Sequence, residues 1–127
     1  MKINRQTIFK KTNGRCAYCG CEVNKFQVDH IVAKSRFEQS IANKNVPTFL
    51  NHLTSKDINH IDNLVAACSV CNKWKSDFSL ELFRNELQQQ IKRLNNFSSN
   101  YRIAKKYGLV KELPKNIVFY FETIKPQ

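Results

Sequence analysis

The chain has 127 residues, 42% of them hydrophobic, and 21 Lys and Arg against 10 Asp and Glu give it a formal net charge of +11. This length predicts a single domain over residues 1–127, with room for one core but not for two. The basic side chains are spread over the whole chain, which favours a folded domain whose basic face binds nucleic-acid phosphates. A basic surface that is merely solvated is the alternative.

The longest apolar runs are only a few residues, well short of the ~20 that a membrane-spanning helix needs. The N-terminal residues are basic but lead into no apolar stretch and no small-residue cleavage site, so we expect neither a secretory signal nor a membrane partner. A cytoplasmic, intracellular protein fits this pattern. The five cysteines are odd in number and mostly paired as C-x-x-C, which in a reducing compartment favours metal binding over disulfides.

Taken in order, the predicted elements describe an α+β fold. A short basic helix over residues 5–11 is followed by Asn13 and Gly14, a pair typical of a helix stop and a tight turn. Residues 23–32 carry Val, Ile and Phe in partial alternation, which predicts a strand. Asp29 and His30 then fall on opposite faces of this strand or at its end.

The middle of the chain is predicted to be a long inserted loop over residues 35–59, because it is rich in Asn, Ser, Lys and Thr. Pro47 is placed to start a short helix inside it. The apolar run 64–67 predicts a second strand that pairs with the first as a hairpin. A helix over residues 69–75 should follow and carry Cys71 and Asn72 inward.

Residues 78–127 are predicted to form a helical extension of a core that spans residues 1–77. Ser79 suits the N-cap of a helix with apolar residues at helical spacing, namely Leu80, Phe83, Leu87, Ile91 and Leu94. Ser99 is expected to cap a second helix, which runs through Tyr107. The apolar residues 117–121 predict a final strand.

Two C-x-x-C pairs, Cys16 with Cys19 and Cys68 with Cys71, supply four thiolates, the shell of a tetrahedral structural zinc ion. A filled shell has no open position for water, so this zinc should hold the fold and do no chemistry. Disulfides or free thiols are the alternatives. Cys21 is expected to be a free thiol rather than a fifth ligand, although it could replace Cys19 in the shell.

A second set of side chains suggests hydrolysis of a phosphodiester. An Asp-His pair alone is more often structural, but Asp29 and His30 are tied through the predicted zinc site to Asn63 and Asn72. A neutral imidazole can take a proton from water, and carboxylate and amide oxygens can hold a hard cation that neutralises the leaving oxygen.

The motifs VDHIV at 28–32, DNLV at 62–65 and CNKWK at 71–75 resemble the HNH nuclease family, in family order and together with both C-x-x-C pairs. The resemblance covers residues 15–77 and implies the ββα-metal architecture. It implies that His30 is the general base, that Asp29 and Asn72 hold one divalent ion, and that Asn63 orients His30 or its loop.

The sequence departs from this family at two points. The last motif residue is often His and here is Asn72, as in the HNH domain of RNA-guided DNA-cutting effectors, which favours Mg²⁺ or Mn²⁺ at the catalytic site. The loop between the motifs is also longer than usual. His52 and His60 lie in or after it, and a structural or solvent-exposed role is expected for both.

The resemblance implies a metal-dependent endonuclease that hydrolyses DNA, with double-stranded DNA as the expected partner. The basic residues expected to contact nucleic acid are Lys34, Arg36, Lys73 and Lys75. A zinc-stabilised module that only binds nucleic acid and an RNA-cleaving toxin on the same scaffold are the rivals. A zinc deaminase fits poorly, since its H-x-E and P-C-x-x-C signatures are absent. The sequence does not choose between a monomer and a homodimer, or among restriction, packaging, homing and phage defence.

Overall fold

A computed structural model describes residues 3–124 and shows a mixed α+β fold, as predicted. Its sheet has two strands, β1 (Gln27–His30) and β2 (Leu64–Ala67), which pair antiparallel with His30 opposite Leu64. The predicted pairing of these two distant segments is therefore confirmed. No helix within residues 3–124 is long and apolar enough to cross a membrane.

The first strand is shorter than predicted, because residues 22–26 belong to the turn before it. Glu22 forms an isolated bridge with Arg15, and the amide of Val23 donates to Gly14 O at 3.2 Å. These backbone groups form their hydrogen bonds within the turn, so they are not available to extend the pairing with β2.

The two faces of β1 have different neighbours. Side chains alternate along a strand, so Gln27 and Asp29 share one face, while Val28 and His30 share the other. Helix α3 (Ser69–Lys75) packs on the face of Asp29. Helix α1 (Arg5–Lys11) packs against β2, and its Ile8 joins an apolar cluster that Val28 borders.

The predicted helices over residues 5–11 and 69–75 are confirmed at both ends. The expectation of a long loop over residues 35–59 is wrong in its first part, since α2 occupies Lys34–Ala42. Phe37 is buried and Ile41, four residues later, packs against the same core. These two apolar residues at helical spacing give α2 a buried face, although the residues between them are polar. The short helix after Pro47 is a single 3₁₀ turn, η1 (Thr48–Leu50), and a second turn, η2 (Ile61–Asn63), leads into β2.

After residue 78 the chain forms α4 (Leu80–Gln88), α5 (Gln90–Phe97) and α6 (Ser99–Lys106). Ser79 caps α4 as predicted, but the helix expected to continue through Leu94 is divided in two at Gln89. The N-cap of α6 is Ser98, whose hydroxyl accepts from the amide of Tyr101, and not Ser99.

The final strand predicted over residues 117–121 is wrong. This segment is extended up to Phe119 and then forms the short helix α7 (Tyr120–Thr123). The amides of Tyr120 and Phe121 donate to the carbonyls of Tyr18 and Ala17, in the turn between the first two cysteines. Glu122 accepts from the amide of Phe119 at 2.8 Å, which starts the helix in place of a strand.

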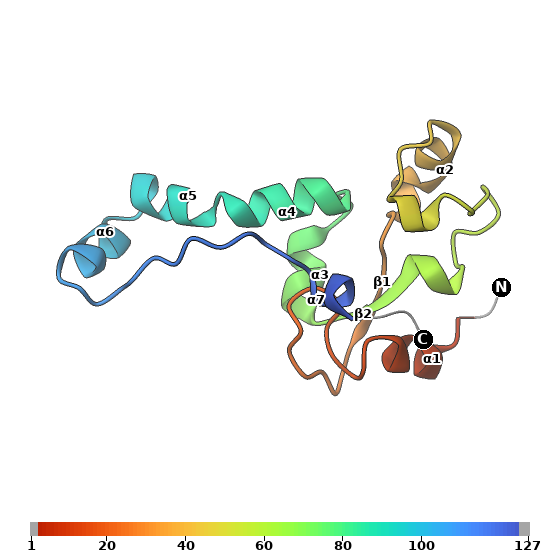
Figure 1. Ribbon diagram of the computed structural model, residues 1–127, viewed down its shortest axis with the longest axis horizontal. Helices are drawn as coiled ribbons and strands as arrows, with labels where there is room; N and C mark the ends of the chain where they lie inside the picture. Colours follow the sequence, from red (N-terminus) through yellow and green to blue (C-terminus); the bar gives the residue numbers. More distant parts are fainter. Residues whose placement is uncertain (1–2, 125–127) are drawn as a thin grey trace.

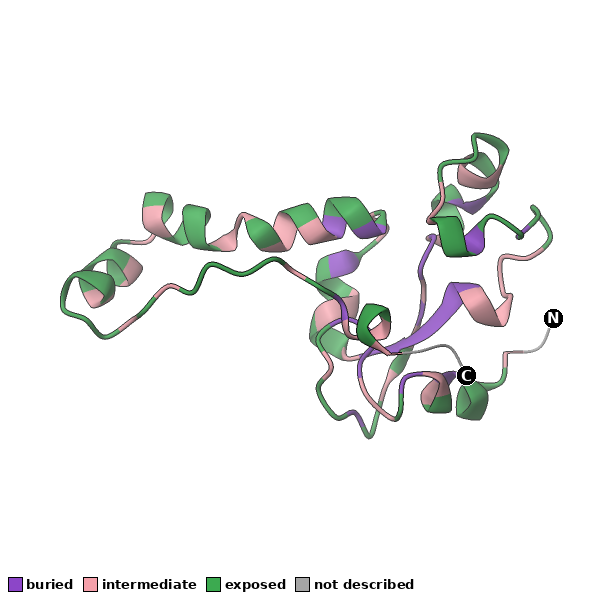
Figure 2. Cartoon of the chain, viewed as in Figure 1, coloured by how far each residue is buried: buried purple, intermediate pink, exposed green. Residues whose placement is uncertain are grey.

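In space, α4 and α5 run end to end away from the sheet, α6 lies at the far end, and residues 107–119 return beside them (Figure 1). Figure 2 shows buried residues concentrated at β2 and its surroundings, whereas the projecting part is mostly exposed. We call α5, α6 and residues 107–118 the arm. The returning chain rejoins the core at Phe119, which stacks on Phe83 with ring centroids 5.3 Å apart.

Candidate functional site

The four cysteines of the two C-x-x-C pairs meet in one cluster. Cys16 and Cys19 come from the turn after α1, whereas Cys68 precedes α3 and Cys71 lies in it. Their four sulfur atoms lie within 4.8 Å of one another, and the Sγ atoms of Cys19 and Cys68 are 3.9 Å apart. Metal–sulfur bonds of 2.3 Å give a tetrahedron with edges of about 3.8 Å. The cluster therefore fits a metal ion such as zinc.

The local backbone conformation positions the cysteines of this cluster. Gly20 adopts a φ of +79°, which lets the chain curl after Cys19, and its amide donates to Cys16 O at 3.0 Å. A Cβ at this glycine would come within 3.3 Å of Tyr120, so a larger residue is also crowded there. On the other side, Cys68 is the N-cap of α3 and its sulfur accepts from the amide of Cys71 at 3.3 Å.

Hydrogen bonds favour the thiolate form of Cys16. The side chain of Cys71 and the backbone amides of Cys68, Cys19 and Tyr18 donate toward Cys16 and lower its pKa to about 4, against the opposing effect of burial. The pKa of Cys71 is raised in turn, first by its hydrogen bond to Cys16. A thiolate is the form that binds a metal ion.

Cys21 lies outside the cluster, in agreement with its predicted role as a free thiol. Its side chain is exposed, and a hydrogen bond to Cys19 is the largest of the effects that raise its pKa to about 12.

Asp29 is buried on the α3 side of the sheet and is bound by two side chains. The Tyr18 hydroxyl donates to its Oδ2, and the Lys75 ammonium lies 3.2 Å from the same oxygen. Burial, followed by the nearby Asp29 charge, raises the pKa of Tyr18 well above its usual value, so this tyrosine is a neutral donor. Within residues 3–124, no hydrogen bond engages Oδ1 of Asp29, which leaves one carboxylate oxygen for another ligand.

The prediction that Lys75 faces nucleic-acid phosphate is wrong. Its side chain is completely buried, and its Nζ donates to His30 O at 2.9 Å besides pairing with Asp29. An ammonium ion is stable at such depth only when a charge and hydrogen bonds compensate it. Lys75 therefore ties α3 to the end of β1, and it is not available to DNA.

His30 is half-buried at the last position of β1, on the face opposite Asp29. Its Nε2 lies 2.8 Å from the side-chain oxygen of Asn59. An amide oxygen only accepts hydrogen bonds, so a neutral His30 imidazole makes this contact with its proton on Nε2 and its lone pair on Nδ1. In that tautomer Nδ1 is the nitrogen that can accept a proton.

Asn63 is fully buried and braces the backbone that follows His30. Its side-chain oxygen accepts from the amide of Val32 at 2.8 Å, and its side-chain nitrogen donates to the carbonyls of Val32 and Ile58. Its own carbonyl accepts from the amide of Ile31 at 2.8 Å. Asn63 contacts the loop after His30 and not the imidazole.

Asn72 lies on α3, and its side-chain nitrogen donates to the side-chain oxygen of Gln27. Since Gln27 shares a face of β1 with Asp29, Asn72 and Asp29 lie on the same side of the sheet. The structure therefore brings Asp29, Asn72 and Lys75 to one side of β1 and leaves His30 on the other side, at the strand end. This agrees with the prediction that Asp29 and His30 lie on opposite faces of the strand or at its end.

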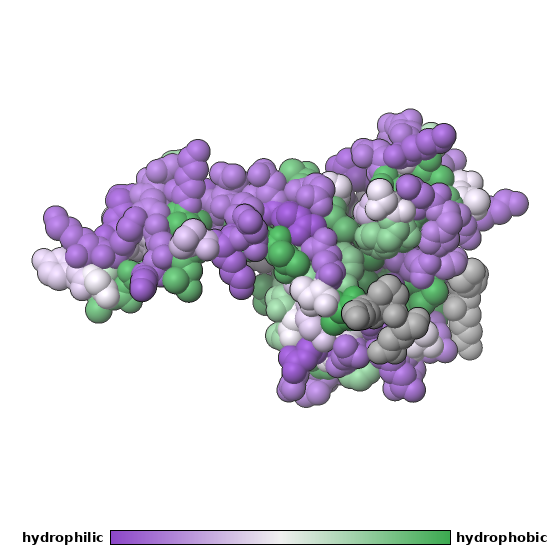
Figure 3. All heavy atoms as spheres, viewed as in Figure 1, coloured by the Kyte–Doolittle hydropathy of each residue, from purple (hydrophilic) through white to green (hydrophobic). Residues whose placement is uncertain are grey.

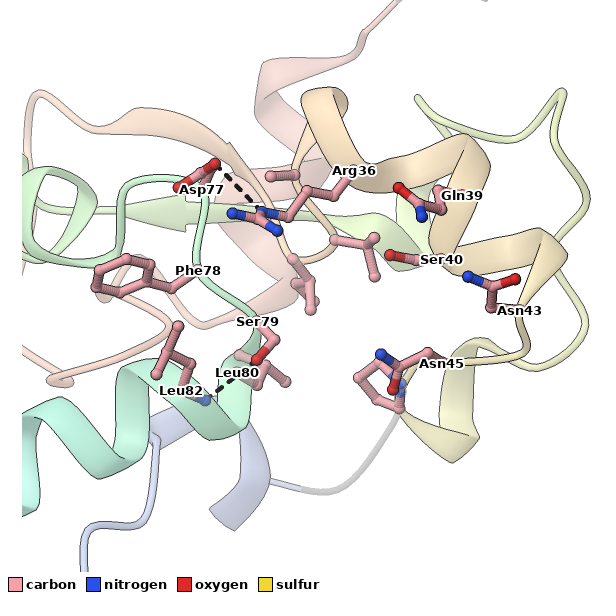
Figure 4. A pocket seen from close by; sticks show the side chains of 14 residues that line it. Arg36, Gln39, Ser40, Asn43, Asn45, Asp77, Phe78, Ser79, Leu80 and Leu82 are labelled. Carbon is pink, nitrogen blue, oxygen red and sulfur yellow. Dashed lines mark hydrogen bonds and ion pairs between the residues drawn. The ribbon is translucent and has the colours of Figure 1, made fainter.

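Three of the four cations predicted to contact nucleic acid are exposed: Lys34, Arg36 and Lys73. Arg36 is paired with Asp77 at 3.2 Å and lines a pocket of about 300 Å³ between α2 and the start of α4 (Figure 4). Lys34 and Lys73 lie at the start of α2 and on α3.

Sequence reasoning missed Tyr18 and Asn59 as members of the site. Tyr18 is one of the two residues that the C-x-x-C spacing leaves unspecified, and Asn59 lies in a polar stretch with many other asparagines. No periodicity or spacing distinguishes either of them, and only the contacts with Asp29 and His30 do. Comparison of the chain with family models, curated proteins and solved structures found no match.

Proposed function

We propose that this protein is a metal-dependent endonuclease of the HNH type that hydrolyses DNA phosphodiester bonds. The observation that supports it best is the state of His30. Its imidazole is half-buried at a strand end, its Nε2 is held by Asn59, and its Nδ1 is left as a base. A half-buried histidine whose Nε2 is held by a hydrogen bond at a strand end suits general-base catalysis better than a freely rotating surface histidine does.

The cysteine cluster has a structural role in this proposal. Its four sulfur ligands would hold zinc in a closed shell, with no position for water or substrate. It joins the turn before β1 to the start of α3, and β1 and α3 carry Asp29 and Asn72. Zinc therefore supplies stability and position, and the chemistry belongs to the strand end.

A second, hard cation would supply charge neutralisation at the phosphate. The unengaged Oδ1 of Asp29 and the amide oxygen of Asn72 are oxygen ligands on one side of the sheet, which suits Mg²⁺ or Mn²⁺. When bound, this ion stabilises the negative charge that develops on the phosphate and its leaving oxygen. The Lys75 ammonium holds Oδ2 of Asp29 and so keeps the carboxylate in place.

The residues of this chain then perform the remaining steps. Nδ1 of His30 takes a proton from a water molecule, whose oxygen bonds to phosphorus as the bond between phosphorus and the 3′-oxygen breaks, and the leaving 3′-oxygen is protonated from solvent. Asn59 stabilises the resulting imidazolium through Nε2. Asn63 keeps the loop after His30 in place and is a positioning residue. Cleavage leaves 5′-phosphate and 3′-hydroxyl ends, and the exposed Lys34 and Lys73 contact the DNA backbone.

One observation favours a second candidate, a zinc-stabilised module that binds nucleic acid without cutting it. The buried pair between Asp29 and Lys75 already neutralises the carboxylate that would otherwise bind the catalytic ion. In this alternative the pair is purely structural, and the net charge of +11 accounts for nucleic-acid binding.

Cleavage assays with supercoiled plasmid, linear duplex, single strands and RNA, each with Mg²⁺, Mn²⁺ or neither, test the proposal. His30→Ala should lose about 10²–10⁴-fold in cleavage rate, the usual contribution of a positioned general base, and should keep its fold. Asn51→Ala changes an exposed residue and serves as the matched control. A folded His30→Ala protein that cuts as fast as the wild type would contradict the proposal, and cleavage of RNA alone would point to the toxin reading.

A further inference from the structure

Outside the cysteine cluster and the strand end, three side chains converge on the surface between η1 and β2. The Nε2 of His52 lies 2.8 Å from Oδ2 of Asp62, and the Nδ1 of His60 lies 3.7 Å from the same oxygen. The rings of His52 and His60 are 5.6 Å apart and nearly perpendicular. One ligand atom from each residue lies within 4.8 Å of the other two.

This arrangement is held by the fold and does not depend on long flexible side chains. Leu50 and Leu53, on either side of His52, are buried in the core, and so is Asn63, next to Asp62. Consecutive turns are closed by amides that donate to carbonyls three residues earlier, from His60 to Asp57 and from Asn63 to His60. The backbone therefore fixes both ends of the segment that carries the three side chains.

The ligand set identifies the kind of ion. Bonds of about 2.0–2.1 Å to imidazole nitrogen and carboxylate oxygen give a tetrahedron with edges of about 3.3 Å, and the two measured separations bracket this value. Two imidazoles and one carboxylate suit Zn²⁺, Co²⁺ or Ni²⁺ better than Mg²⁺. The side chains of His52, His60 and Asp62 are 54%, 31% and 43% exposed, so the remaining coordination position opens to solvent.

We propose that His52, His60 and Asp62 bind one divalent transition-metal ion of the zinc class, at a site separate from the cysteine cluster. On binding, His52 carries its ring proton on Nδ1 and presents Nε2 to the ion. In the free protein, Nδ1 of His60 accepts a hydrogen bond from the Asp62 amide, 3.0 Å away. On binding, His60 gives up this hydrogen bond and its Nδ1 binds the ion. This exchange makes the site weaker than the cysteine cluster, so it fills only after that cluster is occupied.

Asn59, the residue before His60, holds Nε2 of His30. An ion on His60 and Asp62 stiffens the segment that presents this asparagine, and therefore stabilises the contact with His30. The effect of this on cleavage depends on the proposed nuclease function, whereas binding of the ion does not.

The chain has three histidines, so their imidazole signals can be assigned individually by long-range ¹H–¹⁵N NMR. Zn²⁺ is added to protein whose cysteine cluster is already filled. The ring nitrogens of His52 and His60 should shift together, while those of His30 move little. Metal analysis after equilibrium dialysis should find a second ion per chain.

Asp62→Asn and His52→Gln should each weaken this second ion by at least about tenfold, since even the loss of an outer-shell partner of a metal site costs 10–100-fold. Asn51→Ala changes an exposed residue beside His52 that supplies no ligand, so it should bind the ion as tightly as the wild type and is the matched control. Unmoved His52 and His60 signals at saturating Zn²⁺ would overturn the proposal, and so would a shift confined to His30. Neither outcome requires an activity assay, so the metal site and the nuclease function are tested independently.

Discussion

The region around the sheet and the arm are held together by different means. All four residues of β2 are buried, as are Phe37 and Leu50 from the segments that pack beside it. In the arm, α5 and α6 contain no buried residue, and Phe97 is 83% exposed. In Figure 3 the arm is largely hydrophilic, with separate hydrophobic spots and no continuous apolar face in that view.

Polar contacts hold the arm together in place of buried apolar side chains. Glu112 on the returning chain accepts hydrogen bonds from Asn95 of α5 and Tyr101 of α6 and pairs with Lys105 at 3.1 Å. At the junction with the core, Arg84 pairs with Glu122 at 2.8 Å and lies over the ring of Phe119. The comparison indicates that damage to the core should unfold the chain, whereas damage to the arm should stay local.

The largest effect should follow loss of the cysteine cluster. Cys68→Ser removes one sulfur ligand but keeps a side-chain oxygen that can cap α3, so the protein should unfold or aggregate through loss of the metal site, because structural zinc is worth about 10–16 kcal/mol in small zinc domains. Circular dichroism and zinc content measure this. Cys21→Ser is the matched control and should be tolerated. A folded, zinc-free Cys68→Ser protein would contradict the proposed role of the cluster.

The next effect is expected at the buried pair of Asp29 and Lys75. Lys75→Met leaves a buried carboxylate without its partner and should lower the free energy of unfolding by about 3–5 kcal/mol. The double variant that adds Asp29→Asn should recover part of this loss, because no unpaired charge is then buried. Urea unfolding of both variants tests it. Equal stability of the Lys75→Met variant and the wild type would mean that the pair does not form.

Lysine substitutions near the proposed site should weaken nucleic-acid binding more than lysine substitutions in the arm. Affinity for duplex DNA should fall steeply with salt, and removal of one phosphate-contacting lysine should reduce the salt slope by about 1. We expect this for Lys34→Ala and Lys73→Ala near the proposed site, and a smaller change for Lys92→Ala and Lys106→Ala in the arm. A larger effect of the arm lysines would place the DNA on the arm.

The smallest effect on the whole protein should come from the arm. Hydrogen bonds from Asn95, Tyr101 and Lys105 lower the pKa of Glu112. Its stabilising contribution is therefore present above the ordinary glutamate range and is lost as pH falls through the lowered value. Glu112→Gln should abolish this pH dependence. Hydrogen exchange should show faster exchange in α5 and α6 with unchanged protection in β2, and equal loosening of β2 would contradict the division into two regions.

Much of the core could be predicted from the sequence because its signals are local. The apolar run at residues 64–67 predicted the second strand, the helix over residues 69–75 was predicted to follow it, and the observed bounds of both agree. The paired C-x-x-C spacing predicted which four cysteines lie together and which one does not. These features depend on residues a few positions apart, so local propensity and ligand geometry decide them.

Only the tertiary structure decided the environment of each charged or polar group. Lys75 is a basic residue on a short helix, and nothing in its neighbours in sequence distinguishes a buried lysine from one that faces phosphate. Its burial follows from Asp29, 46 positions away, and from the backbone oxygen of His30. Similarly, the end of the strand predicted at residues 117–121 belongs to α7, because Glu122 accepts from the amide of Phe119 and the carbonyls of Tyr18 and Ala17 accept the amides of Tyr120 and Phe121. The sequence by itself determined α1, β2, α3 and the grouping of the four cysteines, whereas contacts between distant segments determined which side chains are free to act, since desolvation and hydrogen-bond partners exist only in the folded chain.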